Sequence, residues 1–143
     1  PVSLSYEIDP CGPAKARELA AIDRVGHYAK GEQEDLNSMI QGLVGEKGRV
    51  HVHFNGPIGD DCNNVEDLVQ RLDQAIVGGI RVFSTNRYAD SVLAGRVSEN
   101  SAGSKAMNIL QSQLSNCADS ERTFLLQQYA NICVNRRELG LDG

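Results

Sequence analysis

Two histidines on one predicted strand are the first residues whose spacing could support chemistry. His51 and His53 are two positions apart, so both side chains would point to the same face of a strand. Asp60 and Asp61 follow them, and two histidines with a carboxylate are a common zinc-ligand set. A small metal-dependent hydrolase is therefore one hypothesis. We favour a strand covered on both faces, with the imidazoles as hydrogen-bonded core or subsurface groups.

The third histidine, His27, precedes Glu32 by five positions. A histidine held by a carboxylate can act as a general base toward a hydroxyl group, and His-x-x-x-x-Asp is the relevant spacing. Here the acid is Glu, and the adjacent Gly31 indicates a loop, so we do not expect catalysis from this pair. The sequence has no Gly-x-Ser-x-Gly elbow and no Gly-Lys-Ser/Thr loop. We interpret Arg136-Arg137 as a solvated pair.

The four cysteines predict reduced, mostly packed thiols. They are widely spread and contain no Cys-x-x-Cys pair, which argues against a disulfide scaffold or a zinc ribbon. They are Cys11, Cys62, Cys117 and Cys133.

The composition is that of a globular chain. The 143 residues include 41% hydrophobic residues, which fits one domain, and no apolar run approaches the roughly 20 residues of a membrane span. A net charge of −5 and an aromatic content of 5% without Trp argue against nucleic-acid binding. The chain opens at Pro1 with no signal-like segment, and we interpret this as a start inside a longer protein.

Periodicity predicts two strands and five or six helices. Alternating apolar residues predict a half-buried strand over 2–8, and a run rich in β-branched residues predicts a second strand over 49–54. Apolar spacing predicts a helix at about 13–28, with Leu19, Ile22 and Val25 facing inward. Amphipathic stripes predict helices at 36–44 and 65–76, with Asp35 and Asn64 as caps. Shorter patterns predict helices from 85 or 86 to 93, at about 104–116 and at about 120–135. We expect 80–83 to be extended or a strand, and 95–103 to be a loop. Two intervening helices favour a parallel crossover between the strands.

Several segments resemble motifs of glycerolipid acyltransferases, in the family's order. Residues 47–58 resemble its G-x-V-x-V-x-F-G-x-P-I segment, and residues 1–7 resemble its fourth block, a Val-Pro-Val strand that continues into Tyr-Glu. Residues 15–19 match K-A-x-E-L, while 72–76 and 82–89 resemble I-D-x-x-I and L-F-P-T-N-Y-x-A. Asn55 and Ser84 stand where Gly and Pro are usual. The similarity is greatest to bacterial 1-acylglycerol-3-phosphate acyltransferases, with glycerol-3-phosphate acyltransferases second.

The resemblance implies an α/β fold, in which residues 1–93 are the C-terminal part of an acyltransferase sheet of two or three strands and residues 94–143 are a helical extension. Family members transfer an acyl chain from acyl-CoA or acyl-carrier protein to a glycerophosphate or lysophosphatidate. Their His-x-x-x-x-Asp and phosphate-binding motifs precede the Val-Pro-Val strand, so no catalytic residue is expected here. Only Pro1 and Val2 match a functional block, which would line the substrate pocket. No metal or cofactor is expected.

A missing N-terminal half would supply the neighbouring strands. We therefore expect an exposed sheet edge and apolar face, and a dimer or higher assembly of the isolated chain. The resemblance also implies a cytoplasmic enzyme with peripheral contact at the inner face of the bacterial inner membrane. Two other functions stay open: a non-enzymatic helical interaction module and the metal-dependent hydrolase.

Overall fold

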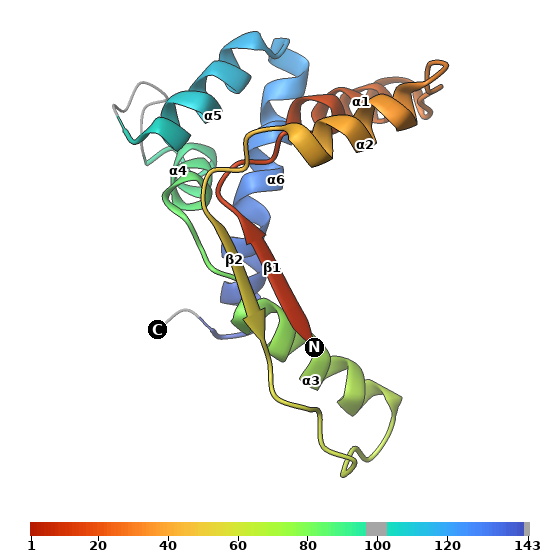
Figure 1. The fold of residues 1–143 in the computed structure, drawn as a ribbon, viewed down its shortest axis with the longest axis vertical. Helices are drawn as coiled ribbons and strands as arrows, with labels where there is room; N and C mark the ends of the chain where they lie inside the picture. The colour runs from red at the N-terminus through yellow and green to blue at the C-terminus, as the bar shows by residue number, and fades with distance from the viewer. Residues whose placement is uncertain (97–102, 142–143) are drawn as a thin grey trace.

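The fold is mixed α/β and mostly helical. The computed structural model describes residues 1–96 and 103–141. Within them, six helices accompany one two-stranded sheet (Figure 1). The elements in chain order are β1 (Val2–Tyr6), α1 (Gly12–Val25), α2 (Glu34–Val44), β2 (Val50–Phe54), α3 (Val65–Gly79), α4 (Ser84–Leu93), α5 (Lys105–Asn116) and α6 (Asp119–Glu138).

The two strands are antiparallel, so the parallel crossover predicted from the sequence is wrong. Val2 lies opposite Phe54, and Tyr6 lies opposite Val50. Helices α1 and α2 carry the chain away from the end of β1 and back to it, so β2 starts beside the point where β1 ends (Figure 1). The amide of Ile8 donates to the carbonyl of Lys47 at 2.9 Å and closes this excursion. Because α1 leads away from the end of β1 and α2 leads back to it, β2 runs in the direction opposite to β1.

The alternating pattern of β1 predicts that its apolar side chains face the core, but the opposite face is buried. The polar side chains of Ser3 and Ser5 are buried, while the apolar side chains between them are exposed. Ser3 Oγ donates to the carbonyl of Ile76 at 2.7 Å, and Ser5 Oγ accepts from the amide of Arg81 at 3.0 Å. The polar face therefore lies on the end of α3 and the segment after it, because these offer backbone hydrogen-bonding groups that need polar partners.

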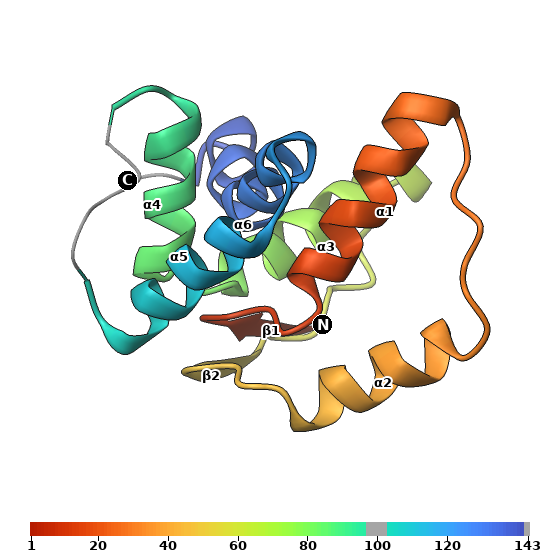
Figure 2. The same cartoon turned by 90° about the horizontal axis from the view of Figure 1, so that it is seen from above.

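The core is built around α6, which packs against α1 and α4. The side chains of Ile8, Leu110 and Leu125 are almost fully buried there. Figure 2 shows α4, α5 and α6 gathered to one side of the strands, with α2 standing apart from them. Helices from before and after residue 93 therefore share one core.

A buried tyrosine fastens the chain after β1 to this core. Tyr129 Oη accepts from the amide of Asp9 at 2.9 Å and donates to Gln113 Oε1 at 3.1 Å. The amide side chain of Gln113 donates in turn to the carbonyl of Asp9 at 3.0 Å. This closed set of hydrogen bonds satisfies the polar groups at the end of β1 and links α5 and α6 to it.

The apolar stripes of three helices are largely exposed, and the predicted inward orientation of Ile22 and Val25 in α1 is wrong. Helix α2 has no buried residue, and its stripe is exposed because, among the described residues, no other element packs over it. Ile22 and Val25 at the end of α1 are exposed for the same reason, and much of the α3 stripe is open. Exposed residues on α2 and α3 include Leu36, Met39, Ile40, Leu43, Val44, Val65, Leu68, Val69 and Ile76.

The helix boundaries follow local capping chemistry. Asn64 caps α3 as predicted, its Oδ1 accepting from the amide of Asp67 at 2.8 Å. The predicted cap by Asp35 is wrong, because α2 begins at Glu34, two residues before the predicted start, and Asp35 instead pairs with Lys30 at 2.7 Å. Residues 80–83 connect α3 to α4 without strand pairing, and of the expected loop at 95–103, residues 97–102 lie outside the described residues.

Candidate functional site

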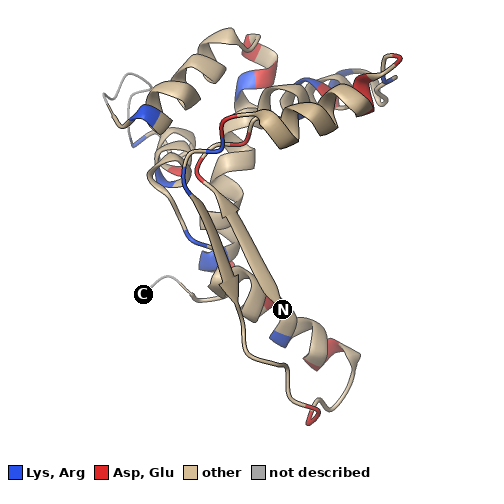
Figure 3. Cartoon of the chain, viewed as in Figure 1, with Lys and Arg blue, Asp and Glu red and all other residues tan. Residues whose placement is uncertain are grey.

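Six apolar side chains form one exposed face of the sheet, which we call the apolar sheet face. The register places each apolar residue of β1 directly opposite one of β2. Their exposed fractions lie between 40% and 77%, and Figure 3 shows no Lys, Arg, Asp or Glu on either strand. The six residues are Val2, Leu4, Tyr6, Val50, Val52 and Phe54. An exposed uncharged patch of this kind on two paired strands is typical of a surface that binds another polypeptide.

The outer edge of β1 can accept another strand. Asn55 donates its amide to the carbonyl of Pro1 at 3.0 Å, and Glu7 donates to that of Arg49 at 3.0 Å. In an antiparallel ladder the hydrogen-bonded pairs alternate, so the backbone groups of Leu4, between these two pairs, point away from β2. The same holds for Val2 and Tyr6. Backbone donors and acceptors on a free edge are a template for strand addition.

A junction at the end of the sheet joins three of the segments that resemble acyltransferase motifs. We call Glu7, Gly48, Arg49, Phe83 and Thr85 the Glu7 junction. Arg49 Nη2 donates to Glu7 Oε1 at 2.7 Å, and Arg49 Nε donates to Glu7 Oε2 at 3.0 Å. The amide of Arg49 adds a third bond to Glu7 Oε2 at 3.1 Å. This bidentate geometry fixes the end of β1 to the start of β2.

Gly48 occupies a position of this junction that disfavours larger residues. Its φ is +62°, and a Cβ atom placed there would lie 3.0 Å from the Cβ of Glu7. A left-handed backbone and a close neighbour both favour glycine. The structure thus explains why glycine stands at position 48.

The third of these segments reaches the junction at the start of α4. Thr85 Oγ1 donates to the carbonyl of Glu7 at 2.7 Å, and Arg49 lies over the ring of Phe83 at 5.2 Å from its centroid. Asn86 accepts from the amide of Phe83 at 2.8 Å and donates to the carbonyl of Tyr129 at 3.0 Å. These contacts hold α4 and α6 in a fixed position relative to the sheet.

The charges of the junction stabilise each other. Hydrogen bonds from Arg49 lower the pKa of the Glu7 carboxyl, against the opposing effect of burial. The hydrogen bond with Glu7 raises the pKa of Arg49 in return. The pair is therefore held in its ionic form. Because Glu7 and Arg49 bond to each other, we interpret the pair as one that holds the two strand ends together.

The two strand histidines lie on the polar face of the sheet. Their ring centroids are 6.3 Å apart and the planes differ by 22°. Within residues 1–96 and 103–141 no three His, Cys, Asp or Glu side chains form a metal-binding group, and the structure offers no third ligand for His51 and His53. Asp61 instead pairs with Arg71 at 2.8 Å.

The interpretation of β2 as a strand covered on both faces is wrong, because its apolar face is open. The imidazoles are also not the hydrogen-bonded core or subsurface groups that the sequence predicted. His53 is exposed, and in the described part of the chain neither ring has a hydrogen-bond partner.

The other residues singled out in the sequence lie on several different elements. His27 is exposed and its Nδ1 lies 3.3 Å from the carbonyl oxygen of Val25, while Glu32 is exposed in the connection to α2. All four cysteines are free thiols, two of them buried, as the spacing predicted. Burial raises the pKa of Cys117. Pro1 is half-buried beside Asn55, and Val2 lies on the apolar sheet face.

Sequence reasoning missed the pairing of Glu7 with Arg49 and the role of Gly79. A Cβ atom on Gly79 would lie 2.6 Å from Ser3 Oγ and 2.7 Å from the His53 ring, so this glycine lets the polar sheet face approach α3. The two glycines at the end of α3 looked like a helix stop only. No local pattern signals a contact with a strand more than 70 residues earlier.

Comparisons with known proteins identify no relative. No family model, no curated protein and no solved structure matches the chain. Among the described helices, none combines the length and apolar character needed to cross a bilayer.

Proposed function

We propose that this chain is the structural part of a glycerolipid acyltransferase. The enzyme would transfer an acyl chain from acyl-CoA or acyl-carrier protein to a glycerophosphate or lysophosphatidate. The observation that carries the proposal is the Glu7 junction. Three segments chosen only for their likeness to family motifs, 1–7, 47–58 and 82–89, contact one another there through Glu7, Arg49 and Thr85.

The chain's contribution in this proposal is scaffolding. The sequence contains no His-x-x-x-x-Asp motif, since Glu32, Gly56 and Ile58 stand five positions after the three histidines. The motif-like residues that the structure places together hold elements to one another by hydrogen bonds and an ion pair. The general base and the phosphate-binding residues would come from a segment that precedes Pro1 in the encoded protein.

The apolar sheet face is the surface on which that catalytic segment would dock. Its side chains are apolar on both strands, and the free edge of β1 offers backbone groups for a further strand. A strand added beside β1 would extend the sheet and bury Val2 and Leu4. Pro1 and Val2 would then lie where the two parts meet, in agreement with a place near the substrate pocket.

The proposed place of action is the cytoplasmic face of the bacterial inner membrane, where lysophosphatidate is present in the bilayer. The exposed stripe of α2 offers apolar side chains for peripheral contact. Its first turn carries Glu34 and Asp35, so the contact would be apolar rather than attraction to anionic lipids.

Acyl transfer by the product of the complete gene tests the proposal. Radiolabelled acyl-CoA and acyl-carrier protein would be offered with glycerol 3-phosphate and with lysophosphatidate. We expect transfer by the complete protein and none by residues 1–143 alone. Leu4→Asp in the complete protein should reduce transfer, whereas Arg24→Ala on exposed α1 should not. Absence of a His-x-x-x-x-Asp motif upstream of Pro1, or of transfer by the complete protein, would reject the proposal.

A non-enzymatic interaction module is the second candidate, favoured by the exposed stripe of α2. That stripe lies outside the sheet and would be a second binding surface, separate from the apolar sheet face. This function requires that the gene encode no acyltransferase motif and that the chain form a stoichiometric complex with a separate protein. Acyl transfer by the complete protein decides against it.

A further inference from the structure

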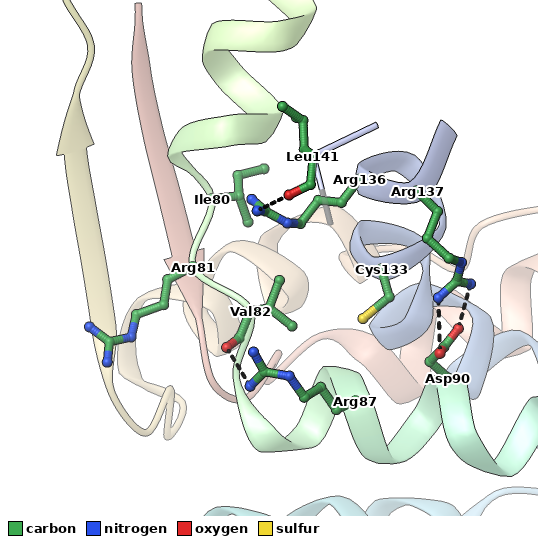
Figure 4. A pocket seen from close by; sticks show the side chains of 9 residues that line it. All are labelled: Ile80, Arg81, Val82, Arg87, Asp90, Cys133, Arg136, Arg137 and Leu141. Carbon is green, nitrogen blue, oxygen red and sulfur yellow. Dashed lines mark hydrogen bonds and ion pairs between the residues drawn. The ribbon is translucent and has the colours of Figure 1, made fainter. Parts of the chain in front are cut away.

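A cavity lies where the segment after α3 meets α4 and α6, away from the apolar sheet face. It has a volume of about 600 Å³, within the roughly 300–1,000 Å³ of small-molecule sites. Figure 4 shows its walls, which combine apolar side chains with arginines. The lining residues are Ile80, Arg81, Val82, Arg87, Asp90, Cys133, Arg136, Arg137 and Leu141.

The cavity is strongly basic in a chain that is acidic overall. Four arginines and one aspartate give its lining a formal charge of +3, whereas the whole chain carries −5. Figure 3 shows basic residues gathered along this part of the chain. The sequence interpretation of Arg136-Arg137 as a solvated pair holds for Arg137, which is exposed, and fails for Arg136, which is half-buried; both residues line the cavity.

The negative charge of Asp90, the one carboxylate among the lining residues, is balanced by bound arginines. Asp90 accepts from Arg137 at 2.7 and 3.1 Å, and from Arg96 at 2.8 Å. These bonds, that from Arg137 foremost, lower the pKa of Asp90 and keep it ionised. Asp90 therefore does not neutralise the other arginines of the cavity.

Arg87 and Arg136 point toward the same backbone segment from two helices, as Figure 4 shows. Arg136 donates to the carbonyl of Leu141 at 2.8 Å and to that of Val77 at 3.4 Å. Arg87 donates only one long bond of 3.4 Å, to the carbonyl of Val82, and within residues 1–96 and 103–141 it has no ion pair. Arg81 turns away toward the strands. Arg87 thus keeps most of its guanidinium donors for a ligand.

We propose that this cavity binds a phosphomonoester, with Arg87 as the principal contact and Arg136 supporting it. Guanidinium groups bind phosphate oxygens in bidentate geometry, which suits a dianionic tetrahedral group. The apolar side chains of Ile80, Val82 and Leu141 would contact the organic substituent. A soluble phosphomonoester and a phospholipid headgroup share this chemistry. The site goes beyond the proposed acyl transfer and does not depend on it.

Titrations of residues 1–143, followed by NMR and calorimetry, test this site. The probes are inorganic phosphate, ethyl phosphate, and phosphatidylcholine vesicles with and without phosphatidic acid. We expect ethyl phosphate to shift the amide signals of residues 80–82 and to bind more tightly than inorganic phosphate. Vesicle binding that requires phosphatidic acid would assign the site to a headgroup, and its absence would assign a soluble ligand.

Variants make the test specific. Arg87→Ala should weaken ethyl phosphate binding by about tenfold or more, because charge-assisted hydrogen bonds are lost. Arg24→Ala, an equal loss of charge on exposed α1, should leave it unchanged, and Asp90→Asn should strengthen it by freeing Arg137. Unchanged circular dichroism verifies the fold of each variant. Equal binding by Arg87→Ala and wild type, or no binding by wild type, would overturn the proposal.

Discussion

Glu7 and Arg49 join the end of β1 to the start of β2 through three hydrogen bonds of 2.7 to 3.1 Å. The Glu7 side chain is 6% exposed, whereas that of Arg49 is 64% exposed. The carboxylate thus lies inside the structure and its partner reaches it from the surface. Both residues belong to motif-like segments, so this pair links the sequence resemblance to the fold.

This pair makes stability depend on pH. Because the pKa of Glu7 is lower in the folded chain than its ordinary value of about 4.3, the unfolded chain binds more protons at acidic pH. The stabilisation is present above the unfolded pKa and is lost as pH falls through the folded pKa. Urea unfolding at a series of acidic pH values should show the loss, and Glu7→Gln should make the dependence shallower.

Other carboxyls with lowered pKa values, such as Asp90, keep part of that pH dependence in Glu7→Gln. Arg49→Met, which retains much of the apolar stem, should make the profile shallower in the same way. The double variant should lose less stability than the sum of the two single variants, because they share one interaction. A profile in Glu7→Gln as steep as that of wild type would contradict the role of the pair.

Gly79 should tolerate no side chain. Gly79→Ala would place a Cβ 2.6 Å from Ser3 Oγ, and we expect a loss of about 1 to 3 kcal/mol in the free energy of unfolding from this overpacking. Gly78→Ala is the matched control, because its Cβ would meet only Leu141, at 3.9 Å. Thermal unfolding of both variants decides the matter. Equal stability of the two would show that the polar sheet face does not rest on α3.

Ser84, which stands where the similar segment of glycerolipid acyltransferases has proline, should accept a proline. It is exposed at the first position of α4, where the amide needs no intrahelical partner, and the preceding Phe83 is extended with φ −90° and ψ 169°. We expect Ser84→Pro to stabilise the chain by about 0.5 kcal/mol, measured by urea unfolding.

The neighbouring Thr85 supplies the contrast to Ser84. Thr85→Val should destabilise the chain by about 1 to 3 kcal/mol, because the buried carbonyl of Glu7 would lose its 2.7 Å hydrogen bond from the hydroxyl. A destabilising Ser84→Pro together with a neutral Thr85→Val would contradict the assigned start of α4 and its contact with the sheet.

The sequence predicts the elements well because their signals are local. The stripe from Val65 to Ile76 and the Asn64 cap are contained in one stretch of chain, and α3 forms there. Which side of an element faces the core is not a local property. The alternation in β1 identifies the strand, but the polar face turns inward because Ser3 and Ser5 find backbone partners near Ile76 and Arg81.

The candidate sites were harder to predict from the sequence than the helices and strands. Glu7 and Arg49 are 42 positions apart, and no spacing rule relates them. The arginine-lined cavity draws Arg87 and Arg136 from helices separated by α5, and only the packing of α4 on α6 brings them together. His51 and His53 suggested a metal site because they are two positions apart in the sequence. Nearness along one strand, however, supplies two metal ligands at most.

The mass of residues 1–143 in solution most directly tests the claim that the apolar sheet face is a docking surface. In the absence of its natural partner, the face should associate with a second copy, so light scattering at high protein concentration should give at least twice 15.5 kDa. Leu4→Asp should restore the mass of one chain, and Val25→Asp, exposed and outside the sheet, should not. A wild-type mass of one chain at high concentration would contradict the claim.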